Sequence, residues 1–195
     1  MGITKPTEIQ SRAIPLGLGG ADIIAVAQTG SGKTLAFVLP IFSALAKKAE
    51  ARAIVFVPSR EMAQQIYRVV HDFSLLTEIE PCLIIGGLPN DKQVSALRKN
   101  PRLIIATPGR MNDHLLTNKL LLKGVEVVVL DEADRMLDMG FAPQLESVRR
   151  TLRGHRQTLM FSASFNPSVE KMAEGFFLQT PYMIRAKAAE RPVSE

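Results

Sequence analysis

The segment 27–34, Ala-Gln-Thr-Gly-Ser-Gly-Lys-Thr, constrains the fold more than any other part of this chain. The apolar run 23–27 before it predicts a buried strand, and the apolar residues 35–39 after it predict the first turns of a helix. Its glycines let the backbone approach phosphate oxygens, and the start of a helix favours an anion. We therefore expect a phosphate-binding loop in which Lys33 reaches the β- and γ-phosphates and the Thr34 hydroxyl binds Mg²⁺.

This loop departs once from the usual pattern Gly-x-x-x-x-Gly-Lys-Ser/Thr, because Ala27 occupies the first position. That position has only to be small, so the departure does not weaken the prediction. The alternative is an ordinary Gly-Ser loop that ends in Lys-Thr. A strand before the loop and a helix after it favour the phosphate-binding interpretation.

The length and composition fit one domain of ordinary size. The chain has 195 residues, and 46% of them are apolar, which is enough for a continuous core. No apolar run approaches the length of a membrane span, and no charged-then-apolar leader opens the chain. We expect a soluble protein of the cytoplasm with no membrane partner; a nucleoid or nuclear location remains open.

The cysteine and histidine content argues against disulfide and metal-thiolate chemistry. Cys82 is the single cysteine, and it lies in the apolar segment 81–85, so we expect a buried thiol. The histidines at 71, 114 and 155 share no metal-ligand spacing. The formal charge of +5 permits a polyanionic partner without requiring one.

Apolar runs and helical periodicities alternate along the chain, which predicts a mainly parallel sheet with helices on both faces. The expected strands are 23–27, 53–57, 81–85, 103–106, 125–130 and 158–162. The expected helices are 7–13, 62–73, 91–99, one that begins at Pro108, 134–139, 145–152 and one that begins at Pro167. The glycine-rich segment 17–20 should break the chain before the first strand. The pattern of alternating apolar and polar residues ends after Tyr182. We therefore expect a domain over residues 1–185 and the start of a linker over 186–195.

Two acids follow the apolar strand 125–130 and could serve the phosphate loop. Asp131, at the strand end, can hold Mg²⁺ through its water shell, and Glu132 can orient and deprotonate an attacking water. The alternative is that these acids only cap the helix 134–139. A phosphate loop about a hundred residues earlier favours the catalytic interpretation.

The sequence Asp131-Glu132-Ala133-Asp134 resembles the signature of the DEAD-box RNA helicases, and segment 27–34 resembles their first motif. Further resemblances follow in the family's order: the glutamine motif at 2–10, motif Ia at 58–61, the double glycine at 86–87, motif Ib at 107–110 and motif III at 162–164. Ser59 and Ser164 stand where the family usually has threonine, and Ser164 keeps the hydroxyl. These matches span nearly the whole chain.

The resemblance implies a RecA-like P-loop domain, a three-layer α/β/α sandwich that uses ATP and Mg²⁺. It implies nucleotide contacts at Lys5, Gln10, Ala27, Gln28, Thr29, Gly30, Ser31, Gly32, Lys33 and Thr34. It implies metal binding at Thr34 and Asp131, and catalysis by Lys33, Asp131 and Glu132.

Gln10 is the residue that we expect to select ATP. Its amide both donates and accepts, which complements N6–H₂ and N7 of adenine. The alternative is a surface glutamine at a helix end. The family's motif also has an aromatic residue upstream that stacks on adenine; the chain begins at Met1, so we expect weaker base affinity.

The resemblance also implies contacts with the backbone of single-stranded RNA. The expected residues are Pro58, Arg60, Gly86, Gly87, Thr107, Pro108, Gly109 and Arg110. A helix capped by Thr107 suits a phosphate, and Arg60 and Arg110 can pair with phosphates. A plain helix cap and a plain glycine turn are the structural alternatives. Backbone contacts predict little sequence preference and a strong dependence on salt.

By the same resemblance, Ser162 and Ser164 hydrogen-bond to Asp134 and couple the ATP state to RNA binding. The family has two such domains in tandem, and the second supplies arginines that stabilise the transition state. We expect an RNA-dependent ATPase and RNA helicase whose first domain alone binds nucleotide weakly and hydrolyses little ATP. Two other classes stay open: a P-loop ATPase that acts on DNA or protein, and a nucleotide-binding module without catalysis.

Overall fold

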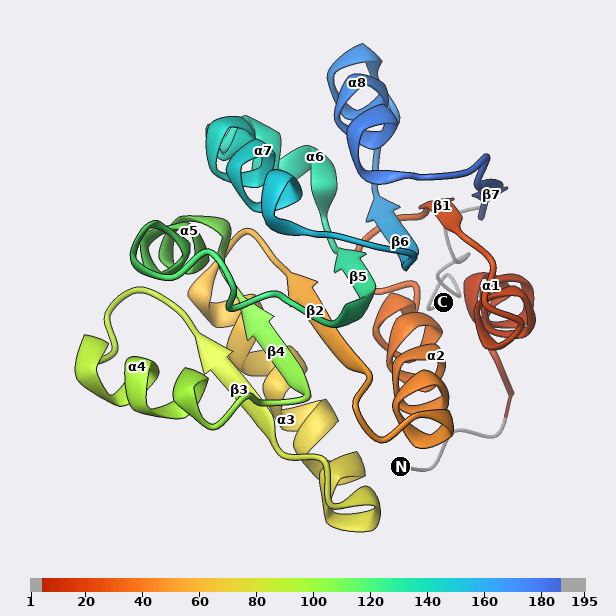
Figure 1. The fold of residues 1–195 in the computed structure, drawn as a ribbon. Coiled ribbons are helices and arrows are strands. Elements are labelled where there is room, and N and C mark those ends of the chain that lie inside the picture. Colours follow the sequence, from red (N-terminus) through yellow and green to blue (C-terminus); the bar gives the residue numbers. More distant parts are fainter. Residues whose placement is uncertain (1–4, 187–195) are drawn as a thin grey trace, which may run out of the picture.

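The structure, a computed structural model, describes residues 5–186 (Figure 1). Within this range the chain forms three layers, with a parallel sheet between two layers of helices. This confirms the predicted fold class. Residues 2–4 of the predicted glutamine motif and residues 187–195 of the predicted linker lie outside the described residues.

The sheet has the strand order β3-β4-β2-β5-β6-β1-β7, and neighbouring strands run parallel. Its strands are β1 (Ile23–Val26), β2 (Arg52–Phe56), β3 (Pro81–Ile84), β4 (Leu103–Ala106), β5 (Val125–Leu130), β6 (Gln157–Ser162) and β7 (Tyr182–Arg185). Because all strands point the same way, the loops that follow them meet at one edge of the sheet.

The helices divide between the two faces of the sheet. One layer holds α1 (Glu8–Leu18), α2 (Lys33–Lys47) and α3 (Arg60–Thr77). The other layer holds α4 (Asn90–Arg98), α5 (Pro108–Thr117), α6 (Ala133–Asp138), α7 (Ala142–Thr151) and α8 (Pro167–Phe176). Each layer therefore covers its own apolar core.

Strand β2 shows why the predicted strands are apolar throughout. Ala53 and Val55 pack into the core beneath α1, α2 and α3, whereas Ile54 and Phe56 pack into the core beneath α4–α8. A strand covered on both faces needs apolar residues at every position.

Helix α1 extends past the predicted range 7–13, and the break predicted over 17–20 begins only at Gly19, after Gly17 and Leu18 have joined the helix. Thr7 and Gln10 form a capping box at its start, and the helix continues through Pro15 to Leu18. A Cβ on Gly17 would lie 2.6 Å from Cγ of Pro40, so Gly17 allows α1 to approach α2 closely. Packing between the two helices outweighs the poor helix propensity of proline and glycine.

Strand β7 lies where the sequence predicts no regular structure, after Tyr182. Its residues pair with β1, and only Ile184 is buried. Ala186, at the first position of the predicted linker, still donates its N–H to Val26 O at 3.0 Å. A four-residue edge strand with one buried side chain leaves almost no alternating pattern in the sequence.

The buried face of α4 includes a polar side chain. Gln93 is buried beside Leu97, whereas Val94 is half-buried. The Gln93 amide donates to Ile85 O at 2.9 Å and to Leu88 O at 3.2 Å. A glutamine therefore holds the glycine-containing turn after β3 against α4.

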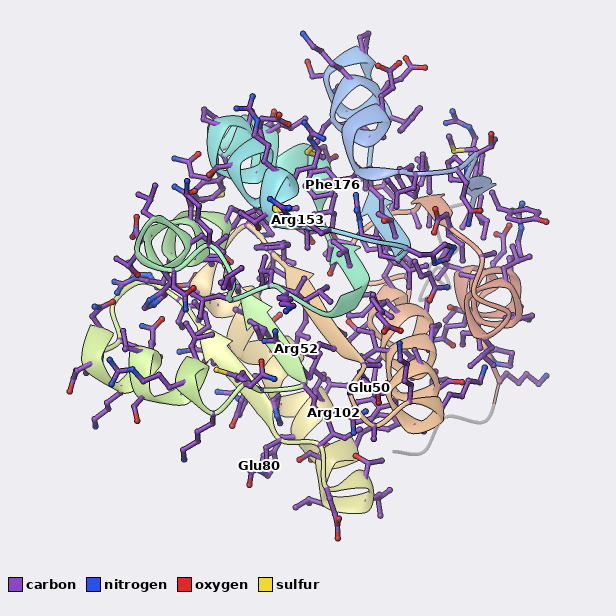
Figure 2. All side chains as sticks on the ribbon, viewed as in Figure 1. Glu50, Arg52, Glu80, Arg102, Arg153 and Phe176 are labelled. Carbon is purple, nitrogen blue, oxygen red and sulfur yellow. The ribbon has the colours of Figure 1, made fainter. Side chains whose placement is uncertain are left out.

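Two arginines, Arg52 (buried) and Arg102 (half-buried), bind backbone carbonyls at the edge of the sheet where the strands begin (Figure 2). Arg52 donates to the carbonyl oxygens of Pro101, Leu121 and Lys123 at 2.8–3.0 Å. Arg102 donates to the carbonyl oxygens of Ala51, Leu45 and Lys48. These bonds satisfy loop carbonyls that the sheet leaves unpaired.

Candidate nucleotide and RNA site

The predicted phosphate loop joins β1 to α2. Ala27 N–H donates to Ser162 O at 2.9 Å, which ties the start of the loop to β6. Gly32 has a left-handed backbone with φ of 89° and precedes α2, whose first turn has no side-chain cap. The N–H groups at the start of α2 therefore remain available to an anion.

Gly32 is required for a reason that the sequence did not reveal. A Cβ at this position would lie 2.6 Å from Gln10 Nε2 and 2.9 Å from Thr7 Oγ1. Gln10 Nε2 also donates to Gly32 O at 3.1 Å, while Gln10 Oε1 accepts from Thr7 N at 3.0 Å. The start of α1 therefore packs directly on the loop at Gly32. Gly30 differs, because a Cβ there would have no atom within 4 Å.

Lys33 and Asp131 come to the same place from opposite halves of the chain. Both side chains are almost fully buried, and Lys33 Nζ donates to Ala27 O at 3.3 Å. Burial raises the pKa of Asp131 to about 6, and the positive charge of Lys33 opposes this rise. The side chains of Lys33 and Asp131 are thus close enough for their charges to interact, as the phosphate-loop prediction requires.

Glu132 lies beside this pair and contacts the loop itself. Thr29 Oγ1 donates to Glu132 Oε1 at 3.4 Å, and Arg135 Nη1 donates to Glu132 Oε2 at 2.8 Å. The Glu132 backbone is left-handed, with φ of 53° and ψ of 53°. Such strain in a residue other than glycine is concentrated at functional sites.

Asp134 connects this acidic segment to the residues that follow β6. Ser164 Oγ and Ser164 N both donate to Asp134 Oδ2 at 3.0 Å, and Asp134 N donates to Ser162 Oγ at 3.2 Å. Hydrogen bonds from these serines lower the pKa of Asp134, although partial burial opposes them. The predicted contact is present, and its role in coupling stays a prediction.

The residues present fit a nucleotide with its metal ion. Ser31 Oγ is buried and has no hydrogen-bond partner among the described residues, although it lies within the loop. Thr34 is half-buried in the first turn of α2, and Lys5, Gln28, Thr29 and Gly30 are exposed. An unpaired hydroxyl, a buried lysine and free helix N–H groups suit phosphate oxygens, and Thr34 and Asp131 offer oxygen ligands to Mg²⁺.

The predicted RNA contacts occupy the other half of the same edge. They follow β2, β3 and β4, which are neighbours in the sheet. The phosphate loop follows β1, the acids Asp131 and Glu132 follow β5, and the serines predicted to couple the two sites lie at the end of β6. The strand order therefore separates two groups of loops that the sequence interleaves.

Two arginines are positioned by close contacts in this half. Arg60 lies against Gly87, where a Cβ would be 2.2 Å from Arg60 Nη1, and Gly87 has φ of 82°. Arg110 Nη1 donates to Asn90 Oδ1 at 3.2 Å. The absence of a side chain at Gly87 thus leaves space for the Arg60 guanidinium. Both arginines lie in the first turn of their helices, α3 and α5.

Thr107 occupies the predicted N-cap position of α5, but its side chain makes no capping hydrogen bond. The first turn of α5 consequently keeps its N–H groups free. Pro58 and Pro108 are buried, Gly86 is half-buried, and a Cβ on Gly109 would lie 3.6 Å from Phe141 Cε1. The RNA roles of these residues stay predictions.

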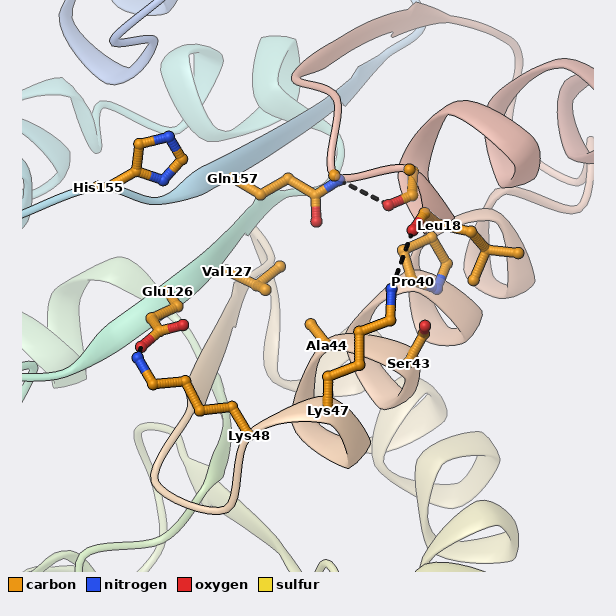
Figure 3. Close-up of a pocket in the computed structure, with 13 residues that line it drawn as sticks. Leu18, Pro40, Ser43, Ala44, Lys47, Lys48, Glu126, Val127, His155 and Gln157 are labelled. Carbon is orange, nitrogen blue, oxygen red and sulfur yellow. Dashed lines mark hydrogen bonds and ion pairs between the residues drawn. The ribbon is translucent and has the colours of Figure 1, made fainter.

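A hollow of about 330 Å³ lies at the opposite edge of the sheet, away from the predicted site (Figure 3). The ends of α1 and α2 and the starts of β5 and β6 line it. Lys47 Nζ donates to Leu18 O at 3.4 Å, Lys48 pairs with Glu126, and the Gln157 amide donates to Gly17 O at 2.8 Å. Its polar groups are largely engaged with one another.

Known proteins identify the group to which this arrangement belongs. A sequence profile described as DEAD/DEAH box helicase matches residues 7–172. The chain belongs to the DEAD/DEAH box helicase family. Its membership explains why a phosphate loop, an acidic strand end and a serine turn meet at one edge of a RecA-like sheet.

Individual members of the family resemble the chain over most of its length. It is 44% identical over 193 residues to "Probable ATP-dependent RNA helicase ddx27" of Dictyostelium discoideum, covering 96% of this chain and 24% of that protein. It is 40% identical over 191 residues to "ATP-dependent RNA helicase CshA" of Listeria monocytogenes, covering 97% of this chain and 36% of that protein. The chain thus spans about a quarter to a third of the length of these relatives.

Solved structures share the fold as well. The crystal structure of a DEAD box protein from Methanococcus jannaschii has a TM-score of 0.87 and 35% identity, covering 94% of this chain and 50% of that one. A hypothetical ATP-dependent RNA helicase from Sulfolobus tokodaii has a TM-score of 0.85 and 32% identity, covering 95% of this chain and 54% of that one.

Across the described residues of our chain, no helix combines the length and the apolar character needed to cross a bilayer.

Three residues of the site were missed by sequence reasoning. Arg135 bonds Glu132, Thr7 packs on Gly32, and Asn90 bonds Arg110. The pattern Thr7-x-x-Gln10 is a capping-box signature, and Arg135 follows Glu132 at helical i,i+3 spacing, so these two carried a signal. Asn90 carried none, because its partner lies 20 residues away.

Proposed function

We propose that this domain belongs to an ATP-dependent RNA helicase, in which hydrolysis of ATP stimulated by RNA drives local unwinding of duplex RNA. The observation that carries the proposal is the meeting of Lys33, Asp131 and Glu132 at one end of the sheet, with Glu132 bonded to Thr29 of the phosphate loop. The names of the curated relatives support the choice of RNA and ATP as substrates.

In the proposed reaction the loop and its lysine hold the triphosphate. Lys33 leaves Ala27 O to pair with the β- and γ-phosphates, while the free N–H groups of α2 and the unpaired Ser31 hydroxyl bind phosphate oxygens. Thr34 and, through water, Asp131 would hold Mg²⁺, which would neutralise charge at the phosphates when bound. Gln10 exchanges a contact with Gly32 O for the edge of adenine.

Glu132 is the proposed general base. Its Oε1 faces Thr29, on the side where the γ-phosphate and the attacking water would lie, and it accepts the proton of that water. Asp134, bonded to Ser164, passes the state of the nucleotide to the RNA-binding loops. The loops after β2, β3 and β4 hold the sugar–phosphate backbone of RNA, with Arg60 and Arg110 on phosphates.

A second RecA-like domain of the same protein is the proposed partner of residues 1–185. The support is that the chain covers 24% and 36% of two helicase relatives. Arginines from such a partner are worth about 10³–10⁵ in rate in other phosphoryl-transfer systems, so the 195-residue chain alone should hydrolyse ATP slowly. We also propose a cytoplasmic location, because ATP and RNA are available there.

The test uses the intact protein and the variant Glu132→Gln. The variant should lose about 10²–10⁴-fold of RNA-stimulated turnover, the usual contribution of a general base, while it still binds ATP. Unchanged turnover would contradict the catalytic proposal and support a nucleotide-binding module. Stimulation by single-stranded DNA equal to that by RNA would contradict the proposed substrate.

A further inference from the structure

Glu132 has its two carboxylate oxygens in different surroundings. Oε1 accepts from Thr29 Oγ1 at 3.4 Å, on the side of the phosphate loop. Oε2 accepts from Arg135 Nη1 at 2.8 Å, on the side of α6. The Glu132 side chain is 5% exposed, whereas the Arg135 side chain is 63% exposed. A solvated arginine therefore reaches inward to a buried carboxylate.

The bond to Arg135 fixes the direction of the other oxygen. A carboxylate is planar, so an anchored Oε2 and a fixed Cγ–Cδ axis leave Oε1 on the side of Thr29. The bond between Arg135 and Glu132 is charge-assisted and short, whereas the bond from Thr29 is long. The arginine is thus the stronger of the two restraints on the carboxylate.

The backbone contributes to the same arrangement. Glu132 has a left-handed conformation and immediately precedes α6, so Arg135 lies one turn later on the same side. Met136 N donates to Glu132 O at 3.1 Å, which fixes the turn that joins the two residues. The backbone therefore holds Glu132 and Arg135 in a fixed arrangement relative to each other.

We propose that Arg135 is a positioning residue for ATP hydrolysis: it anchors Glu132 Oε2 so that Oε1 faces the water that attacks the γ-phosphate. This inference rests on the proposed function, since it takes Glu132 as the general base. It assigns Arg135 no contact with the nucleotide.

The competing explanation is an ordinary i,i+3 ion pair that stabilises the first turn of α6. Exposed helical ion pairs contribute little to stability. A surface pair for comparison is that between Arg150 and Glu146 on α7, at i,i+4 spacing and 2.9 Å, where the arginine side chain is 74% exposed and the glutamate is also bonded by Arg149. Arg150 serves as the control because its partner lies outside the predicted site.

The experiment measures RNA-stimulated ATP hydrolysis by the intact protein with Arg135→Gln, Arg135→Lys and Arg150→Gln. In Arg135→Gln we expect kcat to fall about tenfold, because misplacing a reacting group by about 1 Å can cost up to 10²-fold. KM for ATP should stay within about twofold. Arg135→Lys should recover part of the loss, since lysine keeps the charge but not the planar fork. Arg150→Gln should match the unmodified protein.

Two further measurements separate positioning from folding. The affinity for a fluorescent ATP analogue and the melting temperature should be the same in Arg135→Gln and Arg150→Gln. If Arg135→Gln keeps or raises kcat, if the lysine variant recovers nothing, or if KM rises while kcat stays unchanged, the inference is overturned. Absence of RNA-stimulated hydrolysis in the unmodified protein would instead overturn the proposed function.

Discussion

The two edges of the sheet differ in how their arginines, acids and hydroxyls are paired. Where the strands begin, Arg52 and Arg102 are surrounded by carbonyl oxygens that accept their hydrogen bonds. Where the strands end, Asp131 is buried with a raised pKa, and Ser31 Oγ has no partner among the described residues. At the first edge the two arginines complete the fold, although Asp22 Oδ2 and Arg156 Nε there also lack partners among the described residues. At the second edge we propose that the unpaired groups serve a ligand.

The largest effect should come from the satisfied edge, with Arg52→Met. The change removes the donor for three loop carbonyls, and hydrogen bonds to a charged group are worth about 1.5–3 kcal/mol each without adding fully. Burial already lowers the pKa of Arg52, which offsets part of this loss. We expect about 3 kcal/mol less stability by urea unfolding. Arg153→Met, at an exposed arginine, is the control, and equal stability of the two variants would contradict the comparison.

The next effect concerns binding at the unsatisfied edge, with Lys33→Met. Isothermal titration should show Mg²⁺–ATP binding at least about thirtyfold weaker, or about 2 kcal/mol, because the phosphates lose their buried cation. Stability without nucleotide should change less than in Arg52→Met, since among the described residues Lys33 makes a single hydrogen bond, to Ala27 O at 3.3 Å. Lys47→Met, at the opposite edge, should bind ATP normally. A larger loss of stability than of affinity would show that Lys33 is structural.

Asp131→Asn should act in the opposite direction on stability. Burial raises the pKa of Asp131 to about 6, so the charged carboxylate is disfavoured in the nucleotide-free fold at pH 7.5. Replacing it with a neutral isostere should stabilise the protein by about 1–2 kcal/mol, or a few degrees in Tm, while Mg²⁺-dependent ATP binding is lost. A lower Tm measured by calorimetry would show that Asp131 contributes to the fold.

The smallest effect should come from Asp22→Asn, at the edge where strands begin. Burial raises the pKa of Asp22, although the bond from Thr158 N at 2.8 Å opposes the rise. A raised pKa means that the contribution of this group is present below the unfolded pKa and declines as pH rises through the folded value. Asp22→Asn should therefore reduce the loss of stability that sets in as pH rises above the unfolded pKa of about 4, and this effect should be the smallest of the four. Identical pH profiles of urea unfolding would contradict this.

Much of this fold was predictable from the sequence because its strands are covered on both faces. The strands 103–106 and 125–130 coincide with β4 and β5, since runs of buried aliphatic residues mark them clearly. Strand β7 was missed because it lies at the edge and buries only Ile184. The predicted range 7–13 is shorter than helix α1 because Pro15 and Gly17 are poor helix formers in isolation. Packing on α2 keeps these two residues helical.

The site was predictable where its chemistry is local and unpredictable where it depends on packing. Lys33, Asp131 and Glu132 follow apolar strands, and parallel strands bring such ends together. The need for glycine at position 32 could not be found, because it arises from contact with Thr7 and Gln10 of another helix. Thr107 occupies the N-cap position, as the sequence predicts, but its side chain makes no capping hydrogen bond.

The left-handed backbone of Glu132 has a consequence for how this position can evolve. A glycine there would relieve a conformational cost of about 1–2 kcal/mol and would also remove the carboxylate. Under the proposed role of Glu132, a single change to glycine would therefore make the protein more stable and inactive. The strained glutamate is the state that the proposed turnover needs, at the cost of a less stable turn.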